Sequence, residues 1–198
     1  MKQLVLATHN AHKAEEISAL LADLSVQVLT LDSFPAIGAI AEDADTIEGN
    51  SLLKAETVFR AAGLPSLADD TGLEVYYLAL APGVRSSRYA GDQATYADNV
   101  AKLLKEMQGV PPRRRGARFR CVLTFLAPGT RPVSAEGLCR GTIVTEPRGT
   151  GGFGYDPVFL PIGGEKTFAE LDPSAKNAFS HRGKATAAIL PALRDYFK

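Results

Sequence analysis

The sequence contains no tryptophan, two cysteines and no excess of either charge. Lysine and arginine together number 22, as do aspartate and glutamate, so no net charge attracts duplex nucleic acid. Cys121 and Cys139 lie in strand-like runs without the spacing of metal ligands, which favours two reduced core thiols. No apolar run approaches the roughly 18 residues of a membrane helix, and the apolar start is too short for a signal peptide. We therefore expect a soluble, cytoplasmic protein whose partners include neither nucleic acid nor a membrane.

The rest of the composition is that of an ordinary globular chain. Its 198 residues fit one large domain, or two small lobes around one core, and we treat residues 1–198 as a single domain. Strands are predicted at residues 3–8, 26–30, 73–77, 119–125 and 133–144, the last two pairing antiparallel across a turn at 128–130. Helices are predicted at residues 13–24, 46–62, 94–107 and 174–197, with Pro191 kinking the last or starting a final short helix. The pattern predicts an α/β fold with a mixed sheet.

Two adjacent carboxylates, Asp69 and Asp70, follow a short apolar run and precede Thr71-Gly72. In a strand, neighbouring side chains point to opposite faces, so the two acids cannot both face one site. Ligands bind at strand ends in α/β sheets, and a carboxylate there can hold a hard cation or accept a proton. A turn between two strands is the alternative, and this stretch taken alone favours the turn.

A polar turn, Thr8-His9-Asn10, separates the first predicted strand from the first predicted helix. This arrangement aims free backbone N–H groups at an anion, and Lys13 can add a positive charge. The glycines of a Walker loop are absent, so the turn is a weak signal by itself.

A glycine-rich loop, GTGGFGYDP at residues 149–157, carries two aromatic residues and an acid. Glycine lets a backbone approach a ligand closely, and an aromatic face accepts a stacked base; a flexible hairpin explains the loop equally well. Downstream, the start of the last predicted helix is polar and basic, a composition that usually faces solvent. The arginine-rich run at 113–120 is more typical of a solvated strand entry than of a nucleic-acid patch.

Four of these motifs occur in a fixed order: Thr8-x-Asn10-x-x-Lys13, residues 68–73 (ADDTGL), residues 151–157 (GGFGYDP) and Lys176-x-x-x-Ser180-His181-Arg182-Gly183. Together they resemble the inosine triphosphate pyrophosphatase family, the non-standard purine nucleoside triphosphate diphosphatases, over nearly the whole chain. The resemblance implies a long mixed central β-sheet flanked by helices, in two lobes with an active-site cleft between them. It also implies Mg²⁺-dependent cleavage of ITP, dITP and XTP to the monophosphate and pyrophosphate, usually by a homodimer.

The resemblance assigns roles to individual residues. Asp70 is the expected general base and, with Glu42, the expected metal ligand; Thr71 is an expected substrate contact. The other expected substrate-binding residues are Thr8, His9, Asn10, Ala11, His12 and Lys13 around the triphosphate, with Phe153, Gly154, Tyr155, Asp156, Lys176, His181 and Arg182 completing the nucleotide site.

The expected base selection has a physical rationale. Hypoxanthine and xanthine carry a keto oxygen at position 6, where adenine has an amino group. Donors such as Arg182 and the backbone near His181 are expected to bind the keto oxygen and to meet adenine donor to donor. The same argument does not explain how guanine, which also has the keto oxygen, is rejected.

The chain departs from the family pattern at His9, His12, Gly49, Arg85 and the glycine-free segment 78–81. These departures affect loop geometry, including that of the phosphate loop, and the dimer contact. No proposed ligand group is changed, because the resemblance implies that His9, Ala11 and His12 contribute mainly backbone. Two other functions stay open. One is a Maf-like pyrophosphatase acting on pyrimidine or modified nucleotides. The other is a nucleotide-binding regulatory module without catalysis, which would require the loss of an acid.

Overall fold

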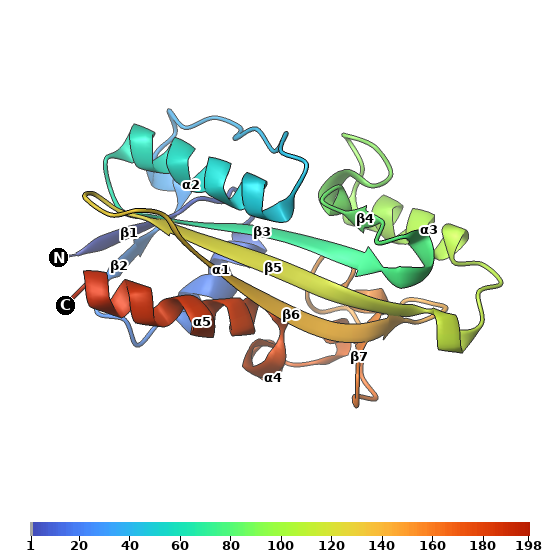
Figure 1. The fold of residues 1–198 in the computed structure, drawn as a ribbon. Coiled ribbons are helices and arrows are strands. Elements are labelled where there is room, and N and C mark those ends of the chain that lie inside the picture. Colours follow the sequence, from blue (N-terminus) through green and yellow to red (C-terminus); the bar gives the residue numbers. More distant parts are fainter. Residues whose placement is uncertain (1) are drawn as a thin grey trace. The chain divides into compact units, whose positions relative to one another are not determined.

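The structure is a computed structural model that describes residues 2–198. These residues form one seven-stranded sheet and five α-helices (Figure 1). The strands are β1 (Gln3–Leu6), β2 (Gln27–Leu29), β3 (Ser66–Val75), β4 (Pro82–Gly83), β5 (Gly116–Leu126), β6 (Val133–Ile143) and β7 (Phe159–Pro161). The helices are α1 (Ala11–Leu20), α2 (Ile47–Ala62), α3 (Tyr96–Glu106), α4 (Pro173–Phe179) and α5 (His181–Tyr196).

The chain folds into two compact units. Unit 1 contains residues 2–70, 121–137 and 181–198, and unit 2 contains residues 71–120 and 138–180. β3, β5 and β6 each contribute residues to both units, whereas every α-helix belongs to one unit. Parallel pairs (β1 with β2 and β3) and antiparallel pairs (β3 with β4, β6 with β7) make the sheet mixed, as predicted.

Unit 1 has a core on each face of its part of the sheet. Alternate residues of β1 separate to the two faces: Leu4 and Leu6 pack with α1 and α5, whereas Val5 packs with α2. In Figure 1, α2 accordingly covers one face of these strands and α5 the other. The predicted arrangement of a central sheet flanked by helices is confirmed.

The ends of α2 follow from its sequence. Thr46 is the N-cap and its hydroxyl accepts a hydrogen bond from the Gly49 N–H at 3.0 Å. Gly63 ends the helix in the left-handed conformation, with φ of 66°. The predicted helix at 46–62 is confirmed to within a residue, because both ends carry a cap that acts locally.

β3 runs without interruption from Ser66 to Val75, so the alternative of a turn at Asp69 to Gly72 is wrong. All residues of the strand are buried except Thr71, which is half-buried. β3 lies between β1 and β5 in the sheet, so neighbouring strands satisfy backbone groups that a turn would have satisfied locally.

The C-terminal helical segment breaks at Ser180 rather than at Pro191. Ser180 has an extended backbone and separates α4 from α5, which continues through Pro191. Pro191 and Ala187, the residue one turn earlier, are both exposed. Water can therefore satisfy the Ala187 carbonyl that loses its helical N–H partner.

Unit 2 is built around its halves of β3, β5 and β6, with β7 next to β6 and β4 paired to β3. Its core joins α3 to these strands through Leu73, Val100 and Leu103, among others. Three aromatic rings, Phe119, Phe159 and Phe168, pack with centroids 4.6–5.9 Å apart. Aromatic pairs at such distances add to the stabilisation that area burial gives.

Ala79 and Leu80 adopt positive φ angles of 52° and 72°, in the segment that lacks the family's glycines. A non-glycine residue in this region costs of order 1–3 kcal/mol, and Leu80 is 43% exposed, so its side chain returns little burial. We expect Ala79→Gly and Leu80→Gly each to raise the free energy of unfolding by about 0.5–1 kcal/mol, because glycine's greater freedom in the unfolded state offsets part of the gain. Urea unfolding of each variant measures this.

The matched control is Ala101→Gly, at an exposed position in the middle of α3. There we expect the opposite sign, a loss of about 1 kcal/mol. A loss of stability in Ala79→Gly and Leu80→Gly as well would show that the left-handed segment stores no strain.

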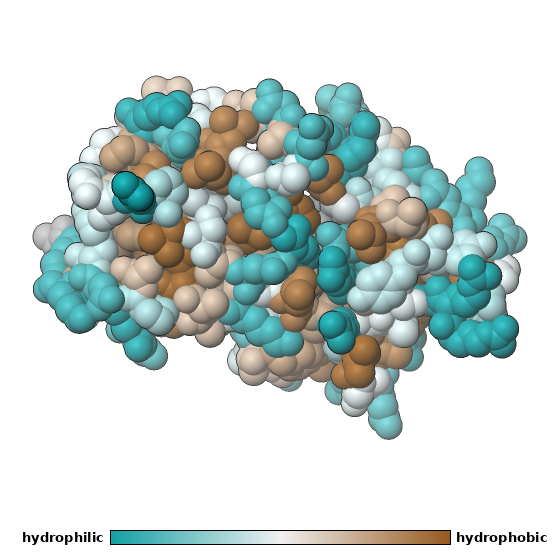
Figure 2. All heavy atoms as spheres, in the orientation of Figure 1, coloured by the Kyte–Doolittle hydropathy of each residue, from teal (hydrophilic) through white to brown (hydrophobic). Residues whose placement is uncertain are grey.

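On the face shown in Figure 2, hydrophilic and hydrophobic residues are interspersed in small groups. Among residues 2–198, no helix is long and apolar enough to cross a membrane.

Candidate active site

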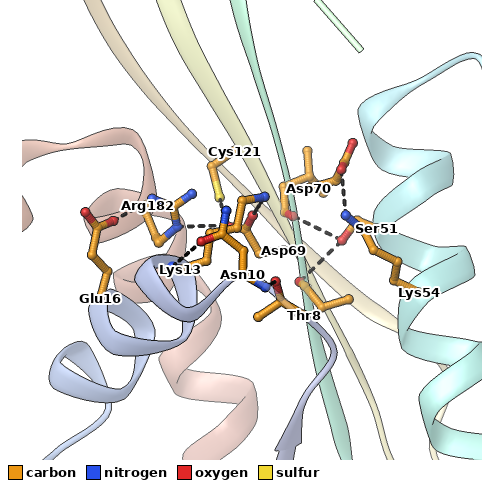
Figure 3. Close-up of polar contacts among 12 residues, drawn as sticks. Thr8, Asn10, Lys13, Glu16, Ser51, Lys54, Asp69, Asp70, Cys121 and Arg182 are labelled. Carbon is orange, nitrogen blue, oxygen red and sulfur yellow. Dashed lines mark hydrogen bonds and ion pairs between the residues drawn. The ribbon is translucent and has the colours of Figure 1, made fainter. Parts of the chain in front are cut away.

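Asp69 is the centre of a buried charged cluster in unit 1. The Lys13 ammonium from α1 contacts its Oδ1, and the Arg182 Nε from α5 donates to its Oδ2 at 2.9 Å. Cys121 Sγ lies 3.2 Å from the same Oδ2, and Arg182 also donates to Glu16 Oε2 at 2.5 Å. In Figure 3 these side chains gather on one side of β3. One strand residue therefore links the first and last helices of the unit.

The charges around Asp69 hold it ionised. Burial alone would raise the pKa of this carboxyl, but Arg182 and Lys13 outweigh burial and keep the pKa well below its usual value. For Arg182, burial disfavours the charge, yet the Asp69 carboxylate raises the guanidinium pKa further. Both side chains are about 1% exposed, so each needs the other as its counter-charge.

Asp70 lies on the opposite side of β3, toward α2 (Figure 3). Lys54 Nζ is 2.6 Å from Asp70 Oδ1 and 3.1 Å from Glu42 Oε1. One ammonium thus joins the two acids that were expected to bind metal. The predicted separation of Asp69 and Asp70 to opposite faces is confirmed.

Asp70 and Glu42 share the Lys54 ammonium, and this arrangement shifts the pKa values of Asp70 and Lys54. Burial raises the pKa of Asp70; Lys54 opposes this effect and Glu42 adds to it. The pKa of Lys54 is raised because its two carboxylate neighbours outweigh burial. Asp70 is therefore a stronger base than an exposed aspartate, as a proton acceptor in catalysis should be.

Ser51 hydrogen-bonds α2 to β5 of the sheet. Its hydroxyl lies 2.9 Å from Thr124 Oγ1 and 3.0 Å from the Val122 carbonyl oxygen. Since Lys54 follows one turn later on the same helix, these contacts also set where its ammonium can reach.

The turn after β1 is organised by its own side chains. Thr8 Oγ1 accepts from the Asn10 N–H at 3.1 Å, and Asn10 Oδ1 caps α1 by accepting from the Lys13 N–H at 3.3 Å. His9 Nε2 lies 3.0 Å from the Gly38 carbonyl oxygen. The turn therefore presents the start of α1, a favourable position for an anion.

Unit 2 holds the glycine-rich loop around Asp156. Asp156 Oδ2 accepts from the Phe153 N–H at 3.0 Å and from Lys176 Nζ at 2.6 Å. The ammonium also lies 4.9 Å from the centroid of the Phe153 ring, within cation–π range. Gly152 has φ of 66°, and a Cβ there would lie 2.2 Å from Asp156 Oδ2, so only glycine fits.

The buried Tyr155 anchors this loop. Its hydroxyl donates to the Ser86 carbonyl oxygen at 2.9 Å, and burial raises its pKa. The Tyr155 hydroxyl is thus bonded within the protein, whereas the half-buried Phe153 ring packs near Lys176 and Tyr96.

The structure gathers the predicted site residues in two groups. Lys13, Glu42, Asp70 and Arg182 lie in unit 1 with the turn that contains Thr8, His9, Asn10, Ala11 and His12. Phe153, Gly154, Tyr155, Asp156 and Lys176 lie in unit 2, as does Thr71. His181 is the buried first residue of α5 in unit 1. The Arg182 guanidinium is held by Asp69 and Glu16, so a role at the nucleobase stays a prediction.

Lys54, Asp69 and Glu16 are site residues that the sequence did not predict. A signal for Lys54 was present, because it shares the buried face of α2 with Ser51 and Ala55. A lysine at a core-facing helical position is rarely buried unless it is paired. No pattern in the sequence indicates Asp69, because its partners Lys13 and Arg182 lie on separate elements far away along the chain.

The sequence model of the Ham1 family matches residues 4–192. The chain belongs to this family. The resemblance drawn from the four motifs is thereby confirmed.

Curated relatives match the Ham1 chain over nearly its full length. The dITP/XTP pyrophosphatase of Geobacillus kaustophilus is 50% identical over 96% of this chain and 93% of its own. That of Geobacter sulfurreducens is 46% identical over 96% and 95%.

Solved Ham1 structures share the fold. The HAM1 protein from Coxiella burnetii is 40% identical and has a TM-score of 0.88 over 98% of this chain and all of its own. The Staphylococcus aureus Ham1 protein is 32% identical, with a TM-score of 0.86 over the whole of both chains.

Proposed function

We propose that this Ham1 chain is a hydrolase that cleaves dITP, XTP and ITP to the monophosphate and pyrophosphate with Mg²⁺. The observation that carries the proposal is the pairing of Asp70 and Glu42 on one ammonium beside the polar turn after β1. The relatives named dITP/XTP pyrophosphatases support the substrate class. Removal of these nucleotides from the pool keeps deaminated purines out of nucleic acid, and we assign this activity to the cytoplasm.

The phosphates are assigned to the turn at residues 8–13. Backbone N–H groups at the start of α1 favour an anion, and the Lys13 ammonium adds a positive charge. Asp69 holds that ammonium in place, so Lys13 does not have to be ordered when the substrate arrives.

The donor set at Glu42 and Asp70 fits Mg²⁺. No cluster of three or more His, Cys, Asp or Glu suited to a metal occurs within residues 2–198. Mg²⁺ is usually held by one or two carboxylates together with substrate phosphates and water, so two acids suffice. The buried ammonium already shared by these acids supports a cation site. When bound, the ion would neutralise charge that develops on the phosphoryl oxygens.

Asp70 orients a water molecule toward the α-phosphate and accepts its proton. Its raised pKa favours this role, and a positioned base contributes about 10²–10⁴ to the rate. The pyrophosphate leaves from the other side of the phosphorus atom, in line with the attacking water.

The nucleobase is assigned to Phe153 and Lys176. Phe153 offers a half-buried ring for stacking, and the Lys176 ammonium, fixed by Asp156, is a donor suited to a keto oxygen. An amino group at position 6 would instead meet a donor, which disfavours adenine.

We also propose a homodimer. Tyr76, Tyr77 and Leu80 lie within five residues after the end of β3 and are each more than 40% exposed. Large exposed side chains grouped in this way are typical of a surface that a partner covers. Arg114 packs over the Tyr77 ring at 4.8 Å, which keeps that ring in place.

Pyrophosphate release from a nucleotide panel tests the function. We expect Mg²⁺-dependent cleavage of dITP, XTP and ITP, poor cleavage of ATP and GTP, and no cleavage in EDTA. Cleavage confined to UTP, dUTP or modified nucleotides would favour the Maf-like alternative. Binding of nucleotide without pyrophosphate release would favour the regulatory module.

A further inference from the structure

The Lys54 ammonium lies between the two carboxylates assigned to the metal. Its Nζ is 2.6 Å from Asp70 Oδ1 and 3.1 Å from Glu42 Oε1, and its side chain is 5% exposed. The two acids thus hold a buried ammonium group between them. Lys13, the lysine assigned to the phosphates, contacts Asp69 instead.

A divalent cation on the same oxygens conflicts with this ammonium. Mg²⁺ binds oxygen at about 2.0–2.1 Å, so an ion on Asp70 Oδ1 would lie no more than about 4.7 Å from an unmoved Nζ. The two cations would repel each other and compete for the same carboxylate lone pairs. Two carboxylates balance the charge of the ion alone, which leaves the ammonium without a counter-charge.

We infer that the Lys54 ammonium occupies the divalent cation's place between Glu42 and Asp70 in the free enzyme, and that metal binding displaces it onto a substrate phosphate. This inference rests on the proposed Mg²⁺-dependent function. A lysine has a flexible four-carbon stem and three rotatable donors, so it can turn to a new acceptor without moving α2. The substrate supplies that acceptor as a phosphate oxygen.

The displacement couples the metal to the substrate. Metal alone must displace an ammonium whose further anionic neighbour, Asp69, already pairs with Lys13 and Arg182, so it binds weakly. Metal with a nucleoside triphosphate leaves every charge paired, so each ligand strengthens the binding of the other by the same factor. Lys54 thereby links metal loading to the presence of substrate.

Mn²⁺ titration of the full chain, followed by calorimetry and by the electron spin resonance of free Mn²⁺, tests the inference. Lys54→Met removes the ammonium and nearly conserves side-chain length. We expect it to bind Mn²⁺ without nucleotide at least about tenfold more tightly than the wild type, a typical coupling factor. Lys13→Met is the matched control, because it also removes one positive charge near Asp70 but not from the two metal-binding carboxylates. It should change the affinity less than about threefold.

The second measurement repeats the titration with an α,β-imido analogue of dITP, which is not hydrolysed. The analogue should tighten Mn²⁺ binding about tenfold in the wild type and much less in Lys54→Met, whose competitor is already absent. Far-ultraviolet circular dichroism and melting with and without Mn²⁺ establish that each variant is folded.

Three results would overturn the inference. The first is that the wild type and Lys54→Met bind Mn²⁺ with equal affinity. The second is that Lys13→Met increases the Mn²⁺ affinity as much as Lys54→Met does. The third is that the dITP analogue strengthens Mn²⁺ binding as much in Lys54→Met as in the wild type. Any of them leaves the proposed function intact, because pyrophosphate release tests that separately. Absence of Mn²⁺ binding from every protein, with or without the analogue, would reject the assigned metal site as well.

Discussion

Replacing Asp70 by asparagine is expected to lower the rate of pyrophosphate release at least about 10²–10⁴-fold. Asparagine has the same shape but cannot accept a proton, so the attacking water loses its base. The change also removes one of the two charges that face the Lys54 ammonium, which weakens the assigned metal site. The measurement is kcat for dITP at saturating Mg²⁺.

The control for this variant is Asp98→Asn. Asp98 is an exposed acid of unit 2 that belongs to the capping box of α3, where its carboxylate accepts from the Thr95 N–H at 2.8 Å. The same chemical change there should cost some helix stability and leave kcat near that of the wild type. A folded Asp70→Asn protein with near-wild-type kcat would remove Asp70 from the mechanism.

Replacing Asp69 by asparagine is expected to lower the free energy of unfolding by about 3–5 kcal/mol at neutral pH, because it breaks a buried ion pair from one side. Lys13 and the fully buried Arg182 would lose their shared counter-charge, although Glu16 would still face the guanidinium. Urea unfolding measures the loss. The exposed pair of Asp195 with Lys198 provides the control, since Asp195→Asn should cost no more than about 1 kcal/mol.

The effect of Asp69 should depend on pH in a definite direction. Its folded pKa lies well below the unfolded value of about 4. The stabilisation is therefore fully present above that unfolded value and is lost as the pH falls through the folded pKa. The difference between wild type and Asp69→Asn should be constant near neutrality and shrink below about pH 4. A difference that grows on acidification would contradict the ion-pair account.

The sequence predicted those parts of the fold whose determinants are local. Thr46 and Gly63 bound α2 by their own hydrogen bond and left-handed φ, so the helix could be placed to within a residue. The course of β3 through Thr71-Gly72 depends on neighbouring strands and two buried faces, which no local pattern contains. For the same reason the sequence did not predict the break at Ser180. It indicated a kink or helix start at Pro191, where α5 continues because this residue faces solvent.

In the candidate site, too, local features could be predicted from the sequence and contacts between separate elements could not. Strand alternation was enough to place Asp69 and Asp70 on opposite faces. It did not reveal that Lys54 would meet Asp70, or that Arg182 would meet Asp69, because these pairs join separate elements. Asp69 also illustrates how a residue beside an expected catalytic acid can be the one on which the buried charges depend.

Unit 1 is built from three separate parts of the chain, and this affects when it can fold during synthesis. Domains fold as the chain leaves the ribosome, earlier segments first. Every residue of unit 2 leaves the ribosome before Arg182, whereas unit 1 is complete only after residues 181–198 have been made. Until then, Asp69 and Glu16 lack the guanidinium that pairs with both. A chain that ends before Arg182 therefore cannot form the ion pairs that complete the charged cluster. Assembly of this part of the site thus depends on translation of the last helix.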